Sequence, residues 1–297
     1  MLRSAFELVP ATGRSLTEAC PGRLACVPAV PVTERLDGLR RELRRLQRVV
    51  VAFSGGADSA LLAWMAHDTL GAAGAQALTA VSPSLAPDEE LDCAALAGEW
   101  GLRWRAVRTD ELADPAYVAN DGQRCAHCKS ALMAVLAPLA TAEGATVVLG
   151  VNLDDLGDHR PGQAAAAAGG AAFPLVTAGF TKSDVRAASR LLGLRTWDKP
   201  AAACLASRVP YGTPVTLRVL TEVAAAEAAL RALGFRELRV RHYGDLARVE
   251  LPVADLSAAL GRRAEVVAAV RSAGYRYVTL DLEGLRSGNL NAALELR

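Results

Sequence analysis

The chain has 297 residues, 52% of them hydrophobic, and a formal net charge of +1. Such a length predicts two domains with sizeable cores, and the near-neutral charge argues against a dedicated nucleic-acid-binding protein. No apolar run reaches the roughly 18 residues that a membrane-spanning helix needs, and residues 1–32 lack the basic and apolar regions of a secretory signal. We therefore predict a cytoplasmic protein with no membrane or nucleic-acid partner and a loose, disordered leader at 1–32.

Alternating strand and helix patterns run from residue 33 to residue 199. We predict helices over 33–47, 58–70, 88–100 and 130–143, another helix after Thr181, and strands over 49–53, 77–81, 103–107 and 146–150. The strands are short and apolar, as buried parallel strands are. This alternation predicts an α/β fold in which a parallel, Rossmann-like sheet is covered by helices on both faces.

The pattern changes after residue 200. Here we predict helices over 216–233 and 262–273 and strands over 237–242, 248–251 and 275–280. These elements indicate a second, smaller α+β domain at 200–297 with its own core. The linker is predicted at 199–214, a stretch that holds three prolines and a glycine.

A glycine-rich loop follows strand 49–53 and opens the next helix; it consists of Ser54, Gly55, Gly56, Ala57, Asp58 and Ser59. The glycines let the backbone approach a phosphate, and the amides at a helix N-terminus bind the anion. The two serines add hydroxyl donors, and Asp58 suits the Mg²⁺ that accompanies ATP. No lysine follows the second glycine, so this is not a Walker loop. An ordinary glycine turn is the alternative interpretation.

An acidic segment follows strand 146–150 and should reach the same carboxyl edge of the sheet, where ligands of open α/β sheets bind. Its candidates for nucleotide or Mg²⁺ contacts are Asp154, Asp155 and Asp158. Lys182, at the start of another helix, is a candidate for contact with the leaving pyrophosphate. A solvated acidic loop and a surface lysine are the alternatives.

Six cysteines in a cytoplasmic chain should be reduced, so metal binding or catalysis is favoured over disulfides. Cys20, Cys26 and Cys93 have no functional pattern around them. Cys125 and Cys128 form a CxxC, which holds zinc, an iron–sulfur cluster or a redox pair. Together with Cys204 they can ligate a cluster and leave one iron open, whereas tetrahedral zinc needs a fourth ligand, a role for which His127 is poorly placed.

Cys204 is followed by polar residues that indicate a surface loop, where functional residues are common. Arg208 and Lys199 are its positively charged neighbours, and such charges lower the pKa of a cysteine. We therefore treat Cys204 and Arg208 as candidate catalytic residues, with Glu227 as a third. A buried, inert cysteine is the alternative.

A basic strand in the second domain carries Arg239 and Arg241 on one face, about 7 Å apart. Two guanidinium groups at this spacing suit a phosphate or a carboxylate, although a solvated edge strand explains them too. Glu227 lies on the face of helix 216–233 that should be buried. A buried carboxylate needs a partner, and we expect Arg239 or Arg241.

These motifs together resemble the LarE family, whose members insert sulfur during synthesis of the nickel-pincer nucleotide cofactor of lactate racemase. The resemblance runs from about Leu36 to Leu285, and it includes the glycine-rich loop, the CxxC and the segments 150–162, 181–186, 199–212 and 239–251. It places the chain among the N-type ATP pyrophosphatases, which cleave ATP between its α and β phosphates. The leader has no counterpart.

The resemblance implies that ATP·Mg²⁺ adenylates the carboxylates of pyridinium-3,5-biscarboxylic acid mononucleotide, which then become thiocarboxylates. Some members give up the sulfur of the cysteine that matches Cys204, whereas others hold a [4Fe–4S] cluster on cysteines that match Cys125, Cys128 and Cys204. This chain resembles the cluster type, so its three sulfurs should converge within about 4–7 Å. Residues matching Glu227, Arg239 and Arg241 form the substrate-phosphate site, and members assemble as hexamers.

Three other functions share some of these features. A tRNA thiolase has the same loop and often three cysteines, but it should carry an additional basic or zinc-ribbon module for RNA. An amidating ATP pyrophosphatase would have no use for Cys204 and the CxxC. A non-catalytic nucleotide-binding protein would use the CxxC for structural zinc.

Overall fold

The computed structural model describes residues 30–156, 161–200, 203–286 and 289. The leader from residue 1 to residue 29, with Cys20 and Cys26, lies outside the described residues, and so does Asp158. Contacts group the chain into two compact units, Met1–Val30 and Pro31–Arg297. Within the second unit, the predicted domain boundary at residue 200 stays a prediction.

Four parallel strands form the first sheet, in the order β3-β2-β1-β4. They are β1 (Val49–Ala52), β2 (Ala75–Val81), β3 (Trp104–Arg108) and β4 (Thr146–Leu149). In the centre of this sheet Val50 pairs with Gln76 on one side and with Val147 on the other. The parallel sheet confirms the predicted α/β class.

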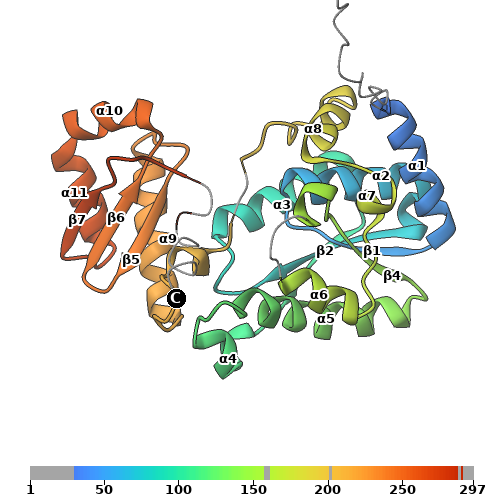
Figure 1. The fold of residues 1–297 in the computed structure, drawn as a ribbon, viewed down its shortest axis with the longest axis horizontal. Coiled ribbons are helices and arrows are strands. Elements are labelled where there is room, and N and C mark those ends of the chain that lie inside the picture. Colours follow the sequence, from blue (N-terminus) through green and yellow to red (C-terminus); the bar gives the residue numbers. More distant parts are fainter. Residues whose placement is uncertain (1–29, 157–160, 201–202, 287–288, 290–297) are drawn as a thin grey trace, which may run out of the picture. The chain divides into compact units, whose positions relative to one another are not determined.

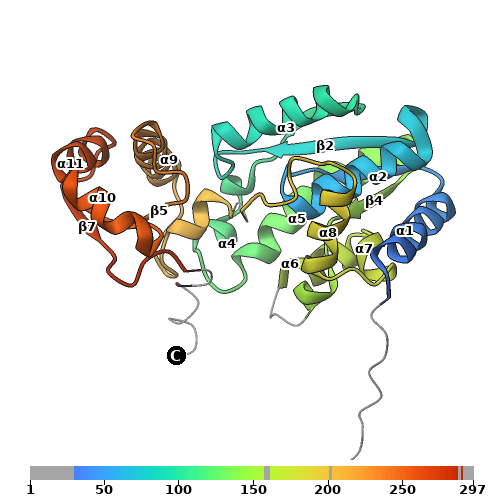
Figure 2. The same ribbon diagram turned by 90° about the horizontal axis from the view of Figure 1, so that it is seen from above.

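Helices cover both faces of this sheet, as Figure 1 shows. On one face lie α1 (Val32–Leu46), α2 (Ala57–Gly74), α3 (Pro87–Trp100) and α8 (Lys182–Leu191), whose core includes Val49 and Val51. On the other face lie α5 (Arg124–Ala142) and α6 (Pro161–Ala168), which run side by side in both views and pack against Val50 (Figures 1 and 2). The alternation of β1 side chains between two cores explains its all-apolar sequence.

The structure corrects the start of one predicted helix. The pattern predicts a helix over 130–143, but α5 begins at Arg124, so the CxxC lies in its first turns and not in a loop. The side chain of Asp121 accepts a hydrogen bond from the N–H of Gln123 (2.7 Å) and forms the turn that opens the helix. Cysteine and histidine are weak helix formers, which hid this turn from a pattern-based prediction.

Several short elements have no predicted counterpart, because three to six residues are too few to show a period. They are α4 (Pro115–Val118), α7 (Pro174–Thr177), α10 (Leu256–Gly261), η1 (Glu111–Ala113), η2 (Leu153–Leu156), η3 (Leu205–Arg208) and η4 (Val253–Asp255).

Among the described helices α5 alone is long and apolar enough, by length and composition, to cross a membrane. Core helices of soluble proteins pass the same test. Arg124 and Lys129 interrupt its apolar sequence, and its Leu132 and Leu136 pack into the core beside the sheet. The location in the cytoplasm stays a prediction.

A second sheet of three strands has the order β5-β6-β7, with β5 and β6 antiparallel and β6 and β7 parallel. Its elements are β5 (Arg239–Tyr243), β6 (Leu246–Glu250), β7 (Tyr277–Leu280), α9 (Leu217–Ala232) and α11 (Arg263–Ser272). Val240 and Val249 pack with residues of α9 and α11 in a separate core. This confirms the predicted α+β unit.

The predicted linker at 199–214 is partly folded. It contains η3, whose Leu205 and Ala206 are buried in a cluster with Tyr117 of α4 and Leu220 of α9. That this segment links two domains stays a prediction. Apolar contacts to α4 and α9 fix the backbone immediately after Cys204.

Candidate active site

The glycine-rich loop has a backbone that requires glycine at Gly55. Its φ of 70° lies in the left-handed region, and a Cβ there would stand 2.9 Å from the Sγ of Cys93 in α3. Gly56 is the N-cap of α2 and no side chain caps this helix end. The first amides of α2 are therefore available to bind an anion, as the sequence predicts.

Two serines fix the shape of this loop. Ser59 donates its hydroxyl proton to the carbonyl of Gly56 (3.1 Å), and its Oγ accepts from the N–H of Ser54 (3.2 Å). The two serine Oγ atoms lie 3.1 Å apart. The hydroxyl groups therefore converge beside the free amides of α2, an arrangement that suits phosphate oxygens.

The loops that follow β1 and β4 meet at the point where the strand order reverses. β2 and β3 extend the sheet to one side of β1, and β4 lies on the other side. A Cβ on Gly150, directly after β4, would stand 2.7 Å from the backbone nitrogen of Ser59. Ligands of open α/β sheets bind at such switch points, so the predicted meeting of the two segments is confirmed.

Polar side chains from three segments form one network at this edge. The amide of Asn152 donates to Asp58 Oδ1 (2.9 Å), Lys182 Nζ lies 3.3 Å from Asp155 Oδ1, and the N–H of Lys182 donates to Asp154 Oδ2 (2.6 Å). Burial raises the pKa of Asp58, and the charge of Asp155 raises it further, while Asn152 and Lys182 oppose both effects. A divalent cation would favour the charged carboxylates, and the assignment of Mg²⁺ to them stays a prediction.

Asn152 is a site residue that the sequence reasoning did not single out. It is fully buried, and its Oδ1 also accepts from the N–H groups of Asp154 (3.0 Å) and Asp155 (3.2 Å). It thereby fixes η2 and orients Asp58. The sequence pattern that could have identified it is an amide side chain between a predicted strand and an acidic segment.

Three cysteines share one electrostatic neighbourhood. Cys125 and Cys128 lie in the first turns of α5, and Cys204 is the N-cap of η3. Burial raises the pKa of Cys128 to about 12, and negative charge at Cys204 and Cys125 contributes to the increase. Cys128 also packs against the apolar cluster that holds Leu205 and Ala206.

The thiols fit an iron–sulfur cluster in kind, because deprotonated cysteines are the usual ligands of such clusters and the iron cations balance their charge. Within the described parts of the chain, no group of three or more histidine, cysteine, aspartate or glutamate side chains has the arrangement of a metal-ion site. Ligands of one cluster bind separate irons and lie further apart than ligands of one ion. That the sulfurs of Cys125, Cys128 and Cys204 lie within about 4–7 Å of one another stays a prediction.

Arg208 and Glu227 form a buried ion pair. Arg208 Nε and Nη2 donate to the two carboxylate oxygens of Glu227 (2.8 and 3.1 Å), and Nη1 donates to the carbonyls of Ala203 (2.6 Å) and Cys204 (3.2 Å). The prediction that Glu227 pairs with Arg239 or Arg241 is wrong. Arg208 is the partner of Glu227 because η3, which carries Arg208, packs on α9, which carries Glu227.

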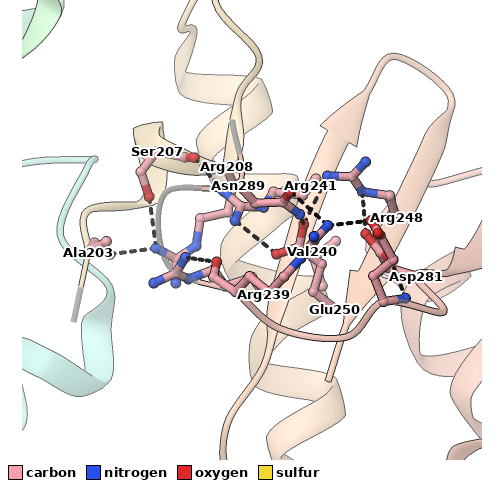
Figure 3. A network of polar contacts seen from close by, with 12 residues as sticks. Ala203, Ser207, Arg208, Arg239, Val240, Arg241, Arg248, Glu250, Asp281 and Asn289 are labelled. Atoms are coloured by element: carbon pink, nitrogen blue, oxygen red, sulfur yellow. Dashed lines mark hydrogen bonds and ion pairs between the residues drawn. The ribbon is translucent and has the colours of Figure 1, made fainter. Parts of the chain in front are cut away.

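The predicted pair on β5 has two different environments, as Figure 3 shows. Arg241 is buried and bonds Glu250 Oε2 (2.8 Å) and the carbonyl of Ser207 (2.8 Å). Arg239 is half-buried and donates to the carbonyl of Arg286 (3.3 Å). Burial and the like charge of Arg241 lower the pKa of Arg239. No carboxylate among the described residues lies within ion-pair distance of Arg239. Arg239 is therefore the better placed of the two to bind an anion.

No family model matches the chain. It is 42% identical over 254 residues to the pyridinium-3,5-bisthiocarboxylic acid mononucleotide synthase of Lactiplantibacillus plantarum, a match that covers 85% of this chain and 92% of that enzyme. The chain belongs to the LarE family. Two further relatives of the chain are uncharacterized proteins. One, of Synechocystis, is 47% identical over 88% of this chain and 98% of its own, and one, of Methanocaldococcus jannaschii, is 24% identical over 85% of this chain and 96% of its own.

Membership in the LarE family confirms that the chain is an enzyme of the sulfur-transferring kind.

One detail of the predicted surroundings of Cys204 needs correction. Lys199, predicted as a charged neighbour of Cys204, bonds Glu89 (2.8 Å) and Asp92 (2.7 Å) of α3 instead. Its ammonium lies 3.6 Å from where a Cβ on Gly55 would stand, so it belongs to the surroundings of the glycine-rich loop.

Proposed function

We propose that this enzyme is an ATP-dependent sulfurtransferase that adenylates the carboxylates of pyridinium-3,5-biscarboxylic acid mononucleotide and converts them to thiocarboxylates. The match with a thiocarboxylate synthase over 85% of the chain carries the proposal. The geometry of the switch point supports it, because a glycine-rich loop with free helix amides there suits the phosphates of ATP.

In the first step a carboxylate oxygen of the substrate attacks the α-phosphorus of ATP. The bond between the α-phosphorus and the bridging oxygen breaks, pyrophosphate leaves, and an acyl-adenylate forms. The amides of α2 and the hydroxyls of Ser54 and Ser59 bind the phosphates, Asp58 and Asp154 serve Mg²⁺, and Lys182 faces the leaving pyrophosphate. Activation is needed because oxide is a poor leaving group and AMP is a good one.

In the second step sulfur at the Cys204 site attacks the acyl carbon, and the bond to AMP breaks. If Cys204 itself is the donor, a thioester forms first; loss of the α-proton and cleavage of the Cβ–S bond then leave dehydroalanine and a thiocarboxylate. Arg208 anchors the backbone of Cys204 through two carbonyls, and Glu227 holds Arg208 in place. These two residues therefore position the sulfur.

We further propose that Cys125, Cys128 and Cys204 hold a [4Fe–4S] cluster. A bound cluster would supply an iron without a protein ligand, at which a transferable sulfide can be held. The CxxC supports this over the sacrificial route, which needs Cys204 alone.

The substrate phosphate is assigned to Arg239, whose half-buried cation has no carboxylate at ion-pair distance in the described chain. Arg241 serves the same site indirectly, since its guanidinium links Glu250 to the carbonyl of Ser207. By the family resemblance we also propose a cytoplasmic homo-oligomer, a hexamer, that binds neither nucleic acid nor membrane.

The test is an anaerobic assay of AMP and pyrophosphate with ATP, Mg²⁺ and the dicarboxylate mononucleotide. The parent should release both products only when the mononucleotide is present, and Ser54→Ala and Asp58→Ala should release neither while unfolding like the parent. ATP consumption by these variants near the parent rate would place the nucleotide elsewhere. Consumption that tRNA stimulates and the mononucleotide does not would favour a tRNA thiolase.

A further inference from the structure

Arg124, in the first turn of α5, is a buried cation. Its side chain and backbone are 5% exposed, and its Nη1 donates to Asn120 Oδ1 and to the carbonyl of Ala206 (2.9 Å). Its guanidinium lies 5.5 Å from the ring centroid of Tyr211. None of the carboxylates in the described parts of the chain lies within ion-pair distance of it. Neutral acceptors alone compensate a buried guanidinium poorly, so an anion is expected nearby.

The segments that carry Cys125 and Cys204 both adjoin this cation. Cys125 is the next residue in the chain, and the bonded carbonyl of Ala206 lies two residues after Cys204. Burial lowers the pKa of Arg124, but the neighbouring side chains of Cys204 and Cys125 outweigh this effect, and its pKa is raised. Arg124 therefore lies between the CxxC turn and the Cys204 loop and contacts both segments.

A second side chain of the same turn binds the same loop. The amide of Asn120 donates to the carbonyls of Val209 (3.3 Å), Pro210 (2.8 Å) and Thr213 (2.8 Å). The backbone carbonyl of Asn120 accepts a hydrogen bond from the N–H of Gly212 (3.0 Å). Asn120 has a φ of 56°, which asparagine tolerates better than most residues. The start of α5 and the turn before it are thus bonded to the chain after Cys204 at several points.

We propose that Arg124 is a positioning residue of the sulfur site, which holds the Cys204 loop against the CxxC turn through a buried, charge-assisted hydrogen bond. The proposal rests on the proposed function, because it takes Cys204 as the transfer site. It adds a role for a residue outside the phosphate loop, the cysteines and the substrate arginines. A neutral residue at this position would leave the loop without its charged anchor.

The experiment measures how fast a short bis-maleimide, bismaleimidoethane, links Cys204 to the CxxC in the full-length apo protein. Trypsin cleaves after Arg124, Lys129 and Arg208, so mass spectrometry identifies the linked peptides in the parent. The variants are Arg124→Met, Arg124→Lys and Asn120→Gly; the last removes the amide but permits the left-handed backbone. Because Arg124→Met removes a cleavage site that Arg124→Lys keeps, digestion with a second protease, specific for aspartate, covers every variant. N-ethylmaleimide labelling of each cysteine and circular dichroism control for thiol exposure and folding.

Arg124→Met should slow linking about tenfold or more, the loss expected for one charge-assisted contact, while single labelling of the thiols continues. Arg124→Lys should restore most of the linking rate, because it keeps the charge and a donor, which a purely structural role of the arginine fork would not predict. Asn120→Gly should fall between them. The activity assay should show pyrophosphate release by Arg124→Met without thiocarboxylate.

Linking by a folded Arg124→Met protein at the parent rate would overturn the proposal. Equal losses in the lysine and methionine variants would also overturn it, since charge would then have no part. If the parent itself fails to link Cys204 to the CxxC, the juxtaposition is absent and this inference falls. The proposed function would stand in that case if AMP, pyrophosphate and thiocarboxylate still form.

Discussion

Replacement of Glu227 should be among the most destabilising single changes in the second half of the chain. The carboxylate is fully buried and accepts hydrogen bonds from Arg208, from Arg231 (3.0 Å) and from the N–H of Val240 (3.1 Å). Arg231 has a second partner in Asp88 (3.2 Å), but Arg208, at 7% side-chain exposure, would retain only neutral acceptors. Breaking a buried pair in this way costs about 3–5 kcal/mol of the free energy of unfolding.

Urea unfolding followed by circular dichroism measures this loss for Glu227→Gln, a change that keeps the volume of the side chain. Glu143→Gln is the matched control, because Glu143 makes a two-point contact with Arg103 (2.9 and 2.9 Å) that lies on the surface. Such an exposed pair contributes about 0–1 kcal/mol. Adding Arg208→Met to Glu227→Gln should recover part of the loss, since no buried charge remains unpaired. Equal losses for Glu227→Gln and Glu143→Gln would refute the reasoning.

Three further outcomes follow from single sites. Gly55→Ala should abolish ATP-dependent pyrophosphate release, because its Cβ would meet Cys93 Sγ at 2.9 Å and its φ is left-handed; an active variant would contradict this. Arg239→Ala should weaken binding of the phosphorylated substrate about tenfold or more without loss of stability, whereas Arg241→Ala should destabilise the fold by leaving Glu250 unpaired; calorimetry and urea unfolding separate the two. Burial raises the pKa of Cys93 from 9.0 to about 11, so the folded state holds this proton more tightly than the unfolded state. The free energy of unfolding of the parent should therefore fall as pH rises from 9 to 11, and it should fall less steeply in Cys93→Ala.

The fold could be predicted because its signals are local. The valine run of β1, the alternation of apolar strands with amphipathic helices, and a glycine-rich loop at a strand end each lie within about a dozen residues. The parallel sheet and its carboxyl edge follow from them. The meeting of Asp58 with the segment after β4 follows as well, because parallel strands end at one edge.

The partners of charged groups could not be predicted in the same way. Glu227 was correctly placed on a buried helix face, but its partner Arg208 lies in a segment that the sequence presents as a linker. Only the packing of η3 on α9 brings the two together. Arg124 was hidden for a related reason: it stands beside the CxxC in sequence, and its burial depends on where the Cys204 loop lies.

The central claim is that sulfur passes from the Cys204 site to an adenylated carboxylate, and mass spectrometry of products and protein after one turnover tests it directly. The parent, with ATP and the dicarboxylate mononucleotide, should yield AMP, pyrophosphate and thiocarboxylate. Cys204→Ser should release pyrophosphate without thiocarboxylate, because AMP stays in the acyl-adenylate until sulfur displaces it. Cys204 should keep its mass if a cluster delivers the sulfur and should lose H₂S, about 34 Da, if the residue itself does. Thiocarboxylate formed by Cys204→Ser at the parent level would contradict the account.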